Sequence, residues 1–297
     1  MELHQLRYFV EVVQTGSFTQ AATRCYVTQP TLSHQIKKLE GFLGEPLLQR
    51  LKQGVQPTPF GKNFYPHAVS ILGGVRAAQE EAASFTSELK GSLHLGVIPT
   101  VAPYLIPKIL KASQEASPQI SFHITEDTTE NLLSSMREGV IDVSILSLPI
   151  DGPEWQIDEL IRDEILVALP NDHPLAEKDD VSLAHCQKET LILMKEAHCL
   201  RGQSLKICQR SGWEPDVHLV STQIDTLLAL VETGMGISFI PALARSSAVP
   251  RQVQLRPFSP ERHYRSIALA RPRQSVPTRA LLRFYQTCMD VLRNPEG

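Results

Sequence analysis

From about residue 91 onward, short apolar runs alternate with helical patterns, and this alternation restricts the fold more than any other feature of the sequence. The first runs are LHLGVIP, ISFHITED and DVSILSL, separated by the helical patterns VAPYLIPKILKAS and TTENLLSSMREG. Later runs are EILVALP, TLILM, DVHLVS and GISFIPA, with a helical pattern at QIDTLLALVETG. Such alternation predicts parallel sheets covered by helices, so most of the chain belongs to the α/β class.

Two threonines follow predicted strands at positions where α/β proteins bind ligands. Ligands of open α/β sheets bind beyond the carboxyl ends of the strands. Thr100 comes just after the run GVIP, and Thr129 stands at the start of the next helical pattern. Ordinary helix capping is common for threonine, and on sequence alone it is the favoured explanation of both residues.

Charge is unevenly distributed along the 297 residues, which are enough for about two domains. The net charge of −3 argues against nucleic-acid binding, but residues 1–66 carry seven basic and four acidic residues, a net charge of +3. A basic head on a more acidic body suits a nucleic-acid-binding module joined to another domain. The N-terminus has no signal-peptide pattern and no apolar run is long enough to span a bilayer, so we expect a cytoplasmic protein without membrane contact.

The first 45 residues carry the pattern of three short helices. Ser17, followed by Gln20, begins the second helix as a capping box, and Thr28 can cap a third helix whose first turn contains Pro30. Two short helices, a tight turn and a polar third helix predict a helix-turn-helix, and a plain three-helix bundle is the alternative. The polar face suits bases and phosphates of the major groove and consists of Thr28, Gln29, Thr31, Ser33, His34 and Lys37.

The stretch LLQRLKQGVQPTPFG predicts a β-hairpin wing that lays Arg50 and Lys52 along the DNA backbone or minor groove. A helical pattern then runs from Thr58-Pro59 to about Leu89, with an expected kink at Pro66. Its apolar side chains are expected to serve a partner helix rather than a monomeric core, which makes this segment a linker and dimerisation helix. They are Phe60, Phe64, Val69, Leu72 and Val75.

Residues 1–89 resemble the LysR-type transcriptional regulators. The resemblance runs through LRYFVEVVQTGSFTQAATRCYVTQPTLSHQIKKLEGFLGEPLLQR, and QPTLSHQIKKLE is its most specific part. Gln53 departs from the family, whose wing usually carries an arginine there, and one backbone contact is therefore in doubt. The resemblance implies a two-lobed fold like that of periplasmic binding proteins for the rest of the chain.

The expected domain organisation follows from the pattern and the resemblance together. Residues 1–58 form a winged helix-turn-helix, 59–89 a linker and dimerisation helix, and 90–297 a regulatory domain. Lobe I of that domain covers about 90–163 and 268–297, and lobe II about 164–267. The crossings between the lobes are expected near 163–168 and 264–269.

The stretch HCLRGQSLKIC holds two cysteines nine positions apart, Cys199 and Cys208. In one unbroken helix they are separated by a rise of about 13.5 Å, whereas a disulfide needs Cα atoms about 4.4–6.8 Å apart. The pair is therefore either accidental or meets only when local structure breaks. Cys199 should lie near a helix N-terminus, where the helix dipole, a protonated His198 and Arg201 favour a thiolate. Cys208 has apolar neighbours and should be a shielded thiol.

The three other cysteines are expected to be structural. Cys25 lies in the second helix, Cys186 in a lobe-surface segment and Cys288 in the last helical pattern. An odd count of five cysteines does not predict a disulfide framework, and no cysteine or histidine cluster has zinc spacing. We therefore expect no metal and no cofactor.

The body resembles the OxyR-type hydrogen-peroxide sensors, one branch of the LysR family. The stretches that carry this likeness are LHLGVIPTVAPYLIPKIL, HCLRGQSLKIC and ETGMGISFIPALA. The resemblance implies that Cys199 reacts with hydrogen peroxide and that Cys208 resolves it in a reversible disulfide. It implies a peroxide pocket lined by Thr100, Thr129 and His198, with Arg265 favouring the thiolate. Gly202 departs from the Asp that is usual in the branch, which could change the ease of switching but not the chemistry.

The resemblance also implies the partners of the chain. These are double-stranded DNA with a two-fold symmetric promoter site, RNA polymerase, hydrogen peroxide and a cytosolic thiol reductant, with a tetramer as the expected assembly. The runner-up is a LysR-type regulator that binds a metabolite between the lobes and whose thiols are incidental. A thiol peroxidase enzyme is disfavoured by the predicted DNA-binding head, and a transport-type solute binder by the lack of a signal peptide.

Overall fold

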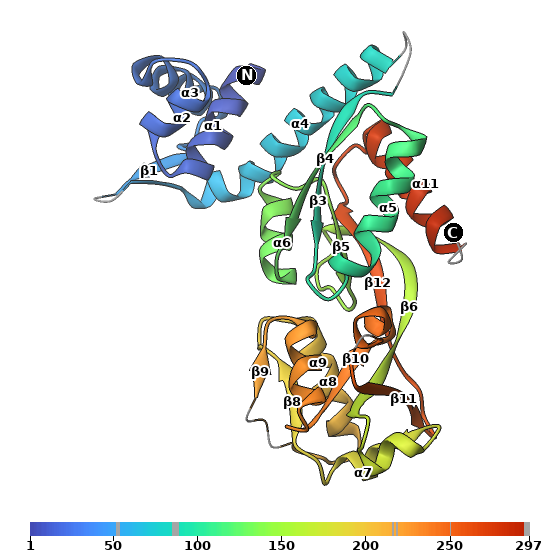
Figure 1. The fold of residues 1–297 in the computed structure, drawn as a ribbon. Helices are drawn as coiled ribbons and strands as arrows, with labels where there is room; N and C mark the ends of the chain where they lie inside the picture. Colours follow the sequence, from blue (N-terminus) through green and yellow to red (C-terminus); the bar gives the residue numbers. More distant parts are fainter. Residues whose placement is uncertain (52–53, 85–88, 216, 218, 250, 294–297) are drawn as a thin grey trace.

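The computed structural model describes residues 1–51, 54–84, 89–215, 217, 219–249 and 251–293. The helical head is joined by one long helix to a body of two α/β lobes (Figure 1). The wing residues Lys52 and Gln53 lie outside the described residues. Within the described part of the chain, no helix is long and apolar enough to cross a membrane.

The head consists of α1 (Leu3–Thr15), α2 (Phe18–Arg24), α3 (Gln29–Leu43) and the antiparallel wing strands β1 (Leu48–Arg50) and β2 (Val55–Pro57). Both predicted capping residues begin their helices. The Ser17 hydroxyl accepts the Gln20 N–H at 3.4 Å, and the Thr28 hydroxyl accepts the Thr31 N–H at 3.4 Å. The helices close over buried apolar side chains, including Leu6, Phe9, Ala21, Leu32, Ile36 and Leu39.

The long helix α4 (Pro59–Ser84) continues through Pro66. The expectation that its apolar side chains serve only a partner helix is wrong for three of them. Phe64, Val69 and Leu72 pack against the core of this chain's own head, next to Phe9 and Tyr65. The reason is that the first half of α4 packs against the head before the helix runs on to lobe I (Figure 1).

Lobe I contains a small parallel sheet with helices on its faces. Its elements are β3 (Gly91–Val97), α5 (Ala102–Ala116), β4 (Ile120–Glu126), α6 (Thr129–Arg137), β5 (Val143–Ser147) and the C-terminal α11 (Arg279–Arg293). Strand β3 pairs in parallel with β4 and β5, as the alternation predicts. The core of the lobe includes Leu95, Val97, Leu132, Ile145, Ile267 and Phe284.

Lobe II contains β7 (Val181–Ser182), α7 (Leu183–Cys186), β8 (Leu191–Met194), α8 (Cys199–Arg210), β9 (Val220–Ser221), α9 (Ile224–Glu232), β10 (Ile237–Pro241), α10 (Arg245–Ala248) and β11 (Val253–Ser259). Two 3-10 turns lie at Pro174–Glu177 and Ala242–Ala244. The strands of this lobe bury a second core, which includes Val167, Leu193, Leu200, Leu227 and Phe239.

Two long strands connect the lobes, β6 (Trp155–Pro170) and β12 (His263–Pro272). They pair antiparallel to each other, so the sheet of the described residues is mixed rather than purely parallel. Its order is β4-β3-β5-β12-β6-β10-β8-β9, and β11 pairs with β6. Asp163 and Arg265 are partners in the register of the two strands and lie between the two cores.

Candidate functional site

A small pocket lies where the carboxyl end of β3 meets the start of α8. It leaves no room for a water-sized molecule as it stands, and it is lined by Ile98, Pro99, Thr100, Thr128, Thr129, Ala197, His198 and Cys199. The structure therefore brings together the four residues Thr100, Thr129, His198 and Cys199 that the sequence singled out. The pocket is narrow, so a small oxidant enters it only with a side-chain adjustment.

Cys199 is the first residue of α8, with His198 at the N-cap position. Cys199 is half-buried and packs against the apolar core of lobe I. Burial raises the pKa of the Cys199 thiol, contrary to the expectation of a favoured thiolate. The Arg265 guanidinium, the first amides of α8 and the Ser147 hydroxyl lower the pKa and oppose this effect without cancelling it.

Arg265 of strand β12 contacts the pocket residue Thr100, and its side chain is fully buried. Its Nε donates to Asp163 Oδ2 at 2.9 Å, its Nη1 to the Thr100 hydroxyl at 2.8 Å and its Nη2 to the Thr100 carbonyl at 3.1 Å. Burial raises the pKa of Asp163, and the Arg265 charge acts in the opposite direction. Sequence reasoning missed Asp163, whose only signal is a charge just before the apolar run EILVALP.

The two threonines at the start of α6, Thr128 and Thr129, have different roles. Thr128 caps the helix, because its hydroxyl accepts the Asn131 N–H at 3.4 Å. The Thr129 hydroxyl is buried and has no hydrogen-bond partner, and Thr129 lines the pocket. Capping therefore does not explain Thr129, and its oxygen is available to a ligand. Thr128 could not be told from Thr129 in the sequence because either residue can cap a helix.

His198 and Arg201 differ from what the sequence suggested. Burial, followed by the charge of Lys195, lowers the pKa of His198, so its imidazole is neutral near pH 7 rather than a cation beside the thiol. Arg201 Nη1 donates to the Met194 carbonyl at 3.2 Å, which ties it to the end of β8. Arg265, which is remote in sequence, is the cation that acts on Cys199.

Cys208 is separated from Cys199 by the unbroken helix α8, and both cysteines are free thiols. Cys208 is fully buried in the core of lobe II, and burial raises the pKa of its thiol to about 12. Nine residues of helix place the two Cα atoms about 13.5 Å apart along the axis. A bond between the two sulfurs therefore requires α8 to unwind.

Helix α8 is held to lobe I by Gln203, one turn after Cys199. Gln203 Nε2 donates to the Ser147 hydroxyl at 2.8 Å and to the Leu148 carbonyl at 3.3 Å. Gly202 lies on α8 between Cys199 and Gln203, and the position that its Cβ would occupy is open space. The structure thus accepts a side chain at 202, and glycine weakens the helix at the turn that must open.

The remaining cysteines lie away from the pocket. Cys288 is buried in lobe I, and Cys25 ends α2 in the head. Cys186 is fully buried at the end of α7, while its neighbours His185 and Gln187 are exposed, which agrees with a structural cysteine in a surface segment. Among the described residues, no group of three or more His, Cys, Asp or Glu side chains could hold a metal ion.

The residues predicted to bind DNA lie on α3 and the wing. Thr31, His34 and Lys37 are exposed on α3, while Gln29 and Ser33 are half-exposed. Thr28 is exposed, but its hydroxyl also bonds the Thr31 hydroxyl at 2.8 Å, which gives it a structural role. On the wing, the Arg50 guanidinium stacks 5.1 Å from the centre of the Phe18 ring. The exposed face of α3 stays the predicted surface for the major groove.

A winged helix-turn-helix, a long connecting helix and a two-lobed α/β domain with a pocket at the lobe junction define a signal-responsive transcriptional regulator. The chain belongs to the LysR family of bacterial regulators. The family model for the bacterial regulatory helix-turn-helix protein, lysR family, matches residues 3–62, and the LysR substrate binding domain matches residues 86–293. Membership confirms the predicted family and a regulator rather than an enzyme.

The matches to similar proteins cover about four fifths of this chain and of each relative. The chain is 35% identical over 244 residues to the DNA-binding transcriptional dual regulator OxyR of Escherichia coli (strain K12), covering 82% of this chain and 80% of that protein. It is 35% identical over 246 residues to a probable hydrogen peroxide-inducible genes activator of Mycobacterium avium, covering 82% and 78%.

Solved structures share the fold. Full-length OxyR from Pseudomonas aeruginosa with a cysteine-to-aspartate substitution has a TM-score of 0.81 at 31% identity and covers 99% of this chain and 95% of that one. A hydrogen-peroxide-bound cysteine mutant of Corynebacterium glutamicum OxyR has a TM-score of 0.65 at 29% identity and covers 99% and 92%. These likenesses confirm the predicted fold.

Proposed function

We propose that this chain is a DNA-binding regulator that senses hydrogen peroxide through Cys199 and a reversible Cys199–Cys208 disulfide. The observation that carries the proposal is the pocket. A cysteine at a helix start, an unpartnered buried hydroxyl of Thr129 and the Thr100 hydroxyl bound by Arg265 all line or adjoin one small cavity. The names of the relatives in Escherichia coli and Mycobacterium avium support the same signal and the control of oxidative-stress genes.

The proposed chemistry has two balanced steps. The Cys199 thiolate attacks one oxygen of hydrogen peroxide, the O–O bond breaks, and sulfenic acid and hydroxide form. The hydroxyls of Thr100 and Thr129 hold the oxidant, and Arg265 stabilises the negative charge on sulfur and on the leaving oxygen. After α8 unwinds, the Cys208 thiol attacks the sulfenic sulfur, a disulfide forms and water leaves.

The raised pKa of the Cys199 thiol lowers the fraction of thiolate but does not prevent the reaction, which proceeds through that fraction. Burial keeps most of the Cys199 population protonated near neutral pH. The geometry of Arg265 and the helix amides then matters most at the moment of attack, when negative charge leaves the sulfur and develops on the peroxide oxygen. The site is thus proposed to act by stabilising the transition state rather than by holding a standing thiolate.

The remaining parts of the proposal follow the domain organisation. Residues 1–58 bind a two-fold symmetric promoter site, 59–89 link and dimerise, and 90–297 sense. The disulfide stabilises a second packing of lobe II, which changes the arrangement of subunits in a tetramer and the position of the paired heads. The activated form contacts RNA polymerase, and a cytosolic thiol reductant restores the resting state.

A thiol titration separates this proposal from a regulator that binds a metabolite between its lobes. The reduced full-length chain has five cysteines, and micromolar peroxide is expected to remove two of the five titratable thiols within minutes. A thiol reductant should restore all five thiols. Because three of the thiols are buried, they are counted after denaturation. A count that stays at five after peroxide treatment would contradict the thiol mechanism and favour a regulator that binds a metabolite between its lobes.

Replacing Gly202 by Ala should slow disulfide formation. Alanine stabilises a helix interior relative to glycine by about 0.5–1 kcal/mol, which is up to about fivefold in the equilibrium for opening α8. The rate of thiol loss after sulfenic acid has formed should fall by about this factor, measured by stopped alkylation. Gly41→Ala is a matched control, because Gly41 also lies in a helix with open space at its Cβ position. An unchanged rate in Gly202→Ala would contradict the unwinding step.

A further inference from the structure

We propose that lobe I contains a coupling route within one subunit, which carries a rearrangement at the Cys199 pocket to the DNA-binding head through a contact at Glu138. The route consists of α6, β3 and β5. It rests on the proposed function, because it begins at the pocket where that function places the reaction. The contacts that support the route lie at the opposite end of lobe I, so they are independent of the contacts in the pocket.

Helix α6 and strand β5 each have one end near the pocket and the other near the boundary with the head, and β3 pairs beside β5. Helix α6 begins at Thr129 in the pocket and ends next to Glu138. Strand β5 begins after Asp142 and ends at Ser147, which bonds the helix of Cys199. Strand β3 ends just before the loop that carries Thr100. The same short elements therefore border both regions.

The head and the linker helix both donate hydrogen bonds to one backbone carbonyl of lobe I. Gln14 Nε2 of α1 donates to the Glu138 carbonyl at 2.9 Å, and the Tyr65 hydroxyl of α4 donates to the same oxygen at 3.0 Å. Burial raises the pKa of Tyr65 to about 12, so its hydroxyl keeps its proton at physiological pH. One atom at the end of α6 thus joins the DNA-binding head, the linker helix and lobe I.

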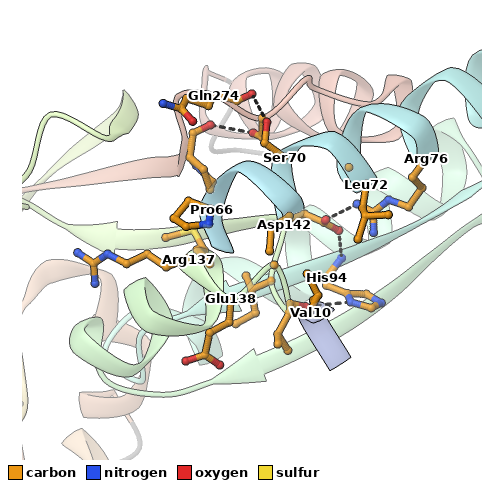
Figure 2. A pocket seen from close by; sticks show the side chains of 18 of the residues that line it. Val10, Pro66, Ser70, Leu72, Arg76, His94, Arg137, Glu138, Asp142 and Gln274 are labelled. Carbon is orange, nitrogen blue, oxygen red and sulfur yellow. Dashed lines mark hydrogen bonds and ion pairs between the residues drawn. The ribbon is translucent and has the colours of Figure 1, made fainter. Parts of the chain in front are cut away.

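A second set of contacts fixes α4 beside the same turn. Arg76 of α4 pairs with Asp142, and Asp142 Oδ2 accepts the His94 backbone N–H at 2.9 Å (Figure 2). Gly139 lies in the left-handed region with φ of +70°, and a Cβ there would lie 2.5 Å from Val69 Cγ1. The close approach requires glycine, so the turn after α6 packs directly against α4.

The elements between the two ends are suited to move as one body. Helix α6 spans about 13.5 Å, and its inner side chains Leu132 and Met136 are fully buried against the sheet. Close-packed cores shift as units rather than deform continuously. Beside the Glu138 contact, a cleft of about 800 Å³ separates head, α4 and lobe I (Figure 2). The head is therefore joined to lobe I at a local contact with open space beside it.

The test uses the full-length chain and a duplex selected by the wild-type protein from a random library. Gln14→Ala, Tyr65→Phe and the combined variant are compared in the reduced and the peroxide-oxidised state. The readout is the ratio of the two DNA affinities, together with the rate of Cys199 oxidation by mass spectrometry. A net hydrogen bond corresponds to about fivefold in an equilibrium, so the ratio should move toward one by up to about fivefold per substitution. The oxidation rate should stay within twofold.

Gln20→Ala and Tyr26→Phe are matched controls, because both residues are exposed on the head, and they should leave the ratio unchanged. An unchanged ratio in the combined variant, with Cys199 oxidised normally, would overturn the coupling route but not peroxide sensing. Failure of Cys199 to oxidise in the wild type would overturn both proposals. Tyr65→Phe removes a single oxygen and keeps the ring packed, so a thermal unfolding curve that matches the wild type completes the comparison.

Discussion

A Cys199→Ser chain is expected to lose peroxide-dependent transcription completely and to keep its DNA binding. Serine preserves the size of the side chain at the start of α8, but its oxygen forms neither a sulfenic acid nor a disulfide. The exposed face of α3 lies in a separate part of the fold and should be unaffected. A promoter-reporter assay with and without peroxide measures the first effect, and a gel-shift titration measures the second.

Two further substitutions serve as a control and as a test of the second chemical step. Cys186→Ala removes a buried thiol of lobe II that the mechanism does not use, and its induction should match the wild type. Cys208→Ser should still form sulfenic acid at Cys199 but no intramolecular disulfide, so its induction should be weak or transient. Full induction in Cys199→Ser would show that peroxide acts through another group.

An Arg265→Met chain is expected to show two large defects, in stability and in reactivity. The substitution leaves the Asp163 carboxylate buried without its charge partner, which costs about 3–5 kcal/mol of folding free energy. It also removes the donor that fixes the Thr100 hydroxyl and the positive charge that lowers the thiol pKa. The rate of Cys199 oxidation should therefore fall by at least about tenfold. Denaturant unfolding and stopped-flow peroxide kinetics measure the two effects.

The double variant Arg265→Met with Asp163→Asn separates the two defects. The amide is uncharged and can still accept the Leu243 N–H that bonds Asp163 Oδ1 at 3.0 Å, so most of the stability should return. The oxidation rate should not return. Equal recovery of both properties would contradict a role for Arg265 at the reaction and leave it a purely structural residue.

The stability defect of Arg265→Met should also depend on pH. Without the arginine, burial holds the pKa of the Asp163 carboxyl above its value in the unfolded chain, so the folded state binds the extra proton. The folded state is then relatively more stable below the unfolded pKa and loses this stability as pH rises through the raised folded pKa. The difference in unfolding free energy between wild type and variant should therefore shrink as pH falls from 7 toward the acid range.

The sequence predicted the local elements well because their signals are local. Ser17 and Thr28 begin their helices through their own hydroxyls, and most of the apolar runs after residue 91 become buried strands. The run ISFHITED instead forms the largely exposed strand β4, and of DVHLVS only Val220–Ser221 forms a strand among the described residues. The strands β1 and β2 also pair antiparallel, as the predicted hairpin wing requires. Cys199 lies at the start of a helix, as expected from its place after a predicted strand.

The misjudged features depend on contacts between distant segments. Arg265 bonds Thr100 across 165 residues of sequence, and Gln203 bonds Ser147 across 56. The resemblance placed Thr100 and Arg265 at the pocket, but the bond between them could not be predicted without the fold. The same holds for the Gln203 contact and for the burial that keeps His198 neutral. Neighbours in sequence therefore indicated Arg201 as the cation that favours the Cys199 thiolate. In the fold, Arg265 is the cation that lowers the pKa of this thiol.

Peptide mapping of the peroxide-treated wild-type chain tests the central claim most directly. The reduced protein is exposed to micromolar peroxide, its thiols are blocked by alkylation, and the digest is analysed by mass spectrometry without reduction. We expect one linked peptide pair that joins Cys199 to Cys208, with Cys25, Cys186 and Cys288 alkylated after denaturation. A digest in which Cys199 stays a free thiol, or in which the link joins other cysteines, would contradict the proposed mechanism.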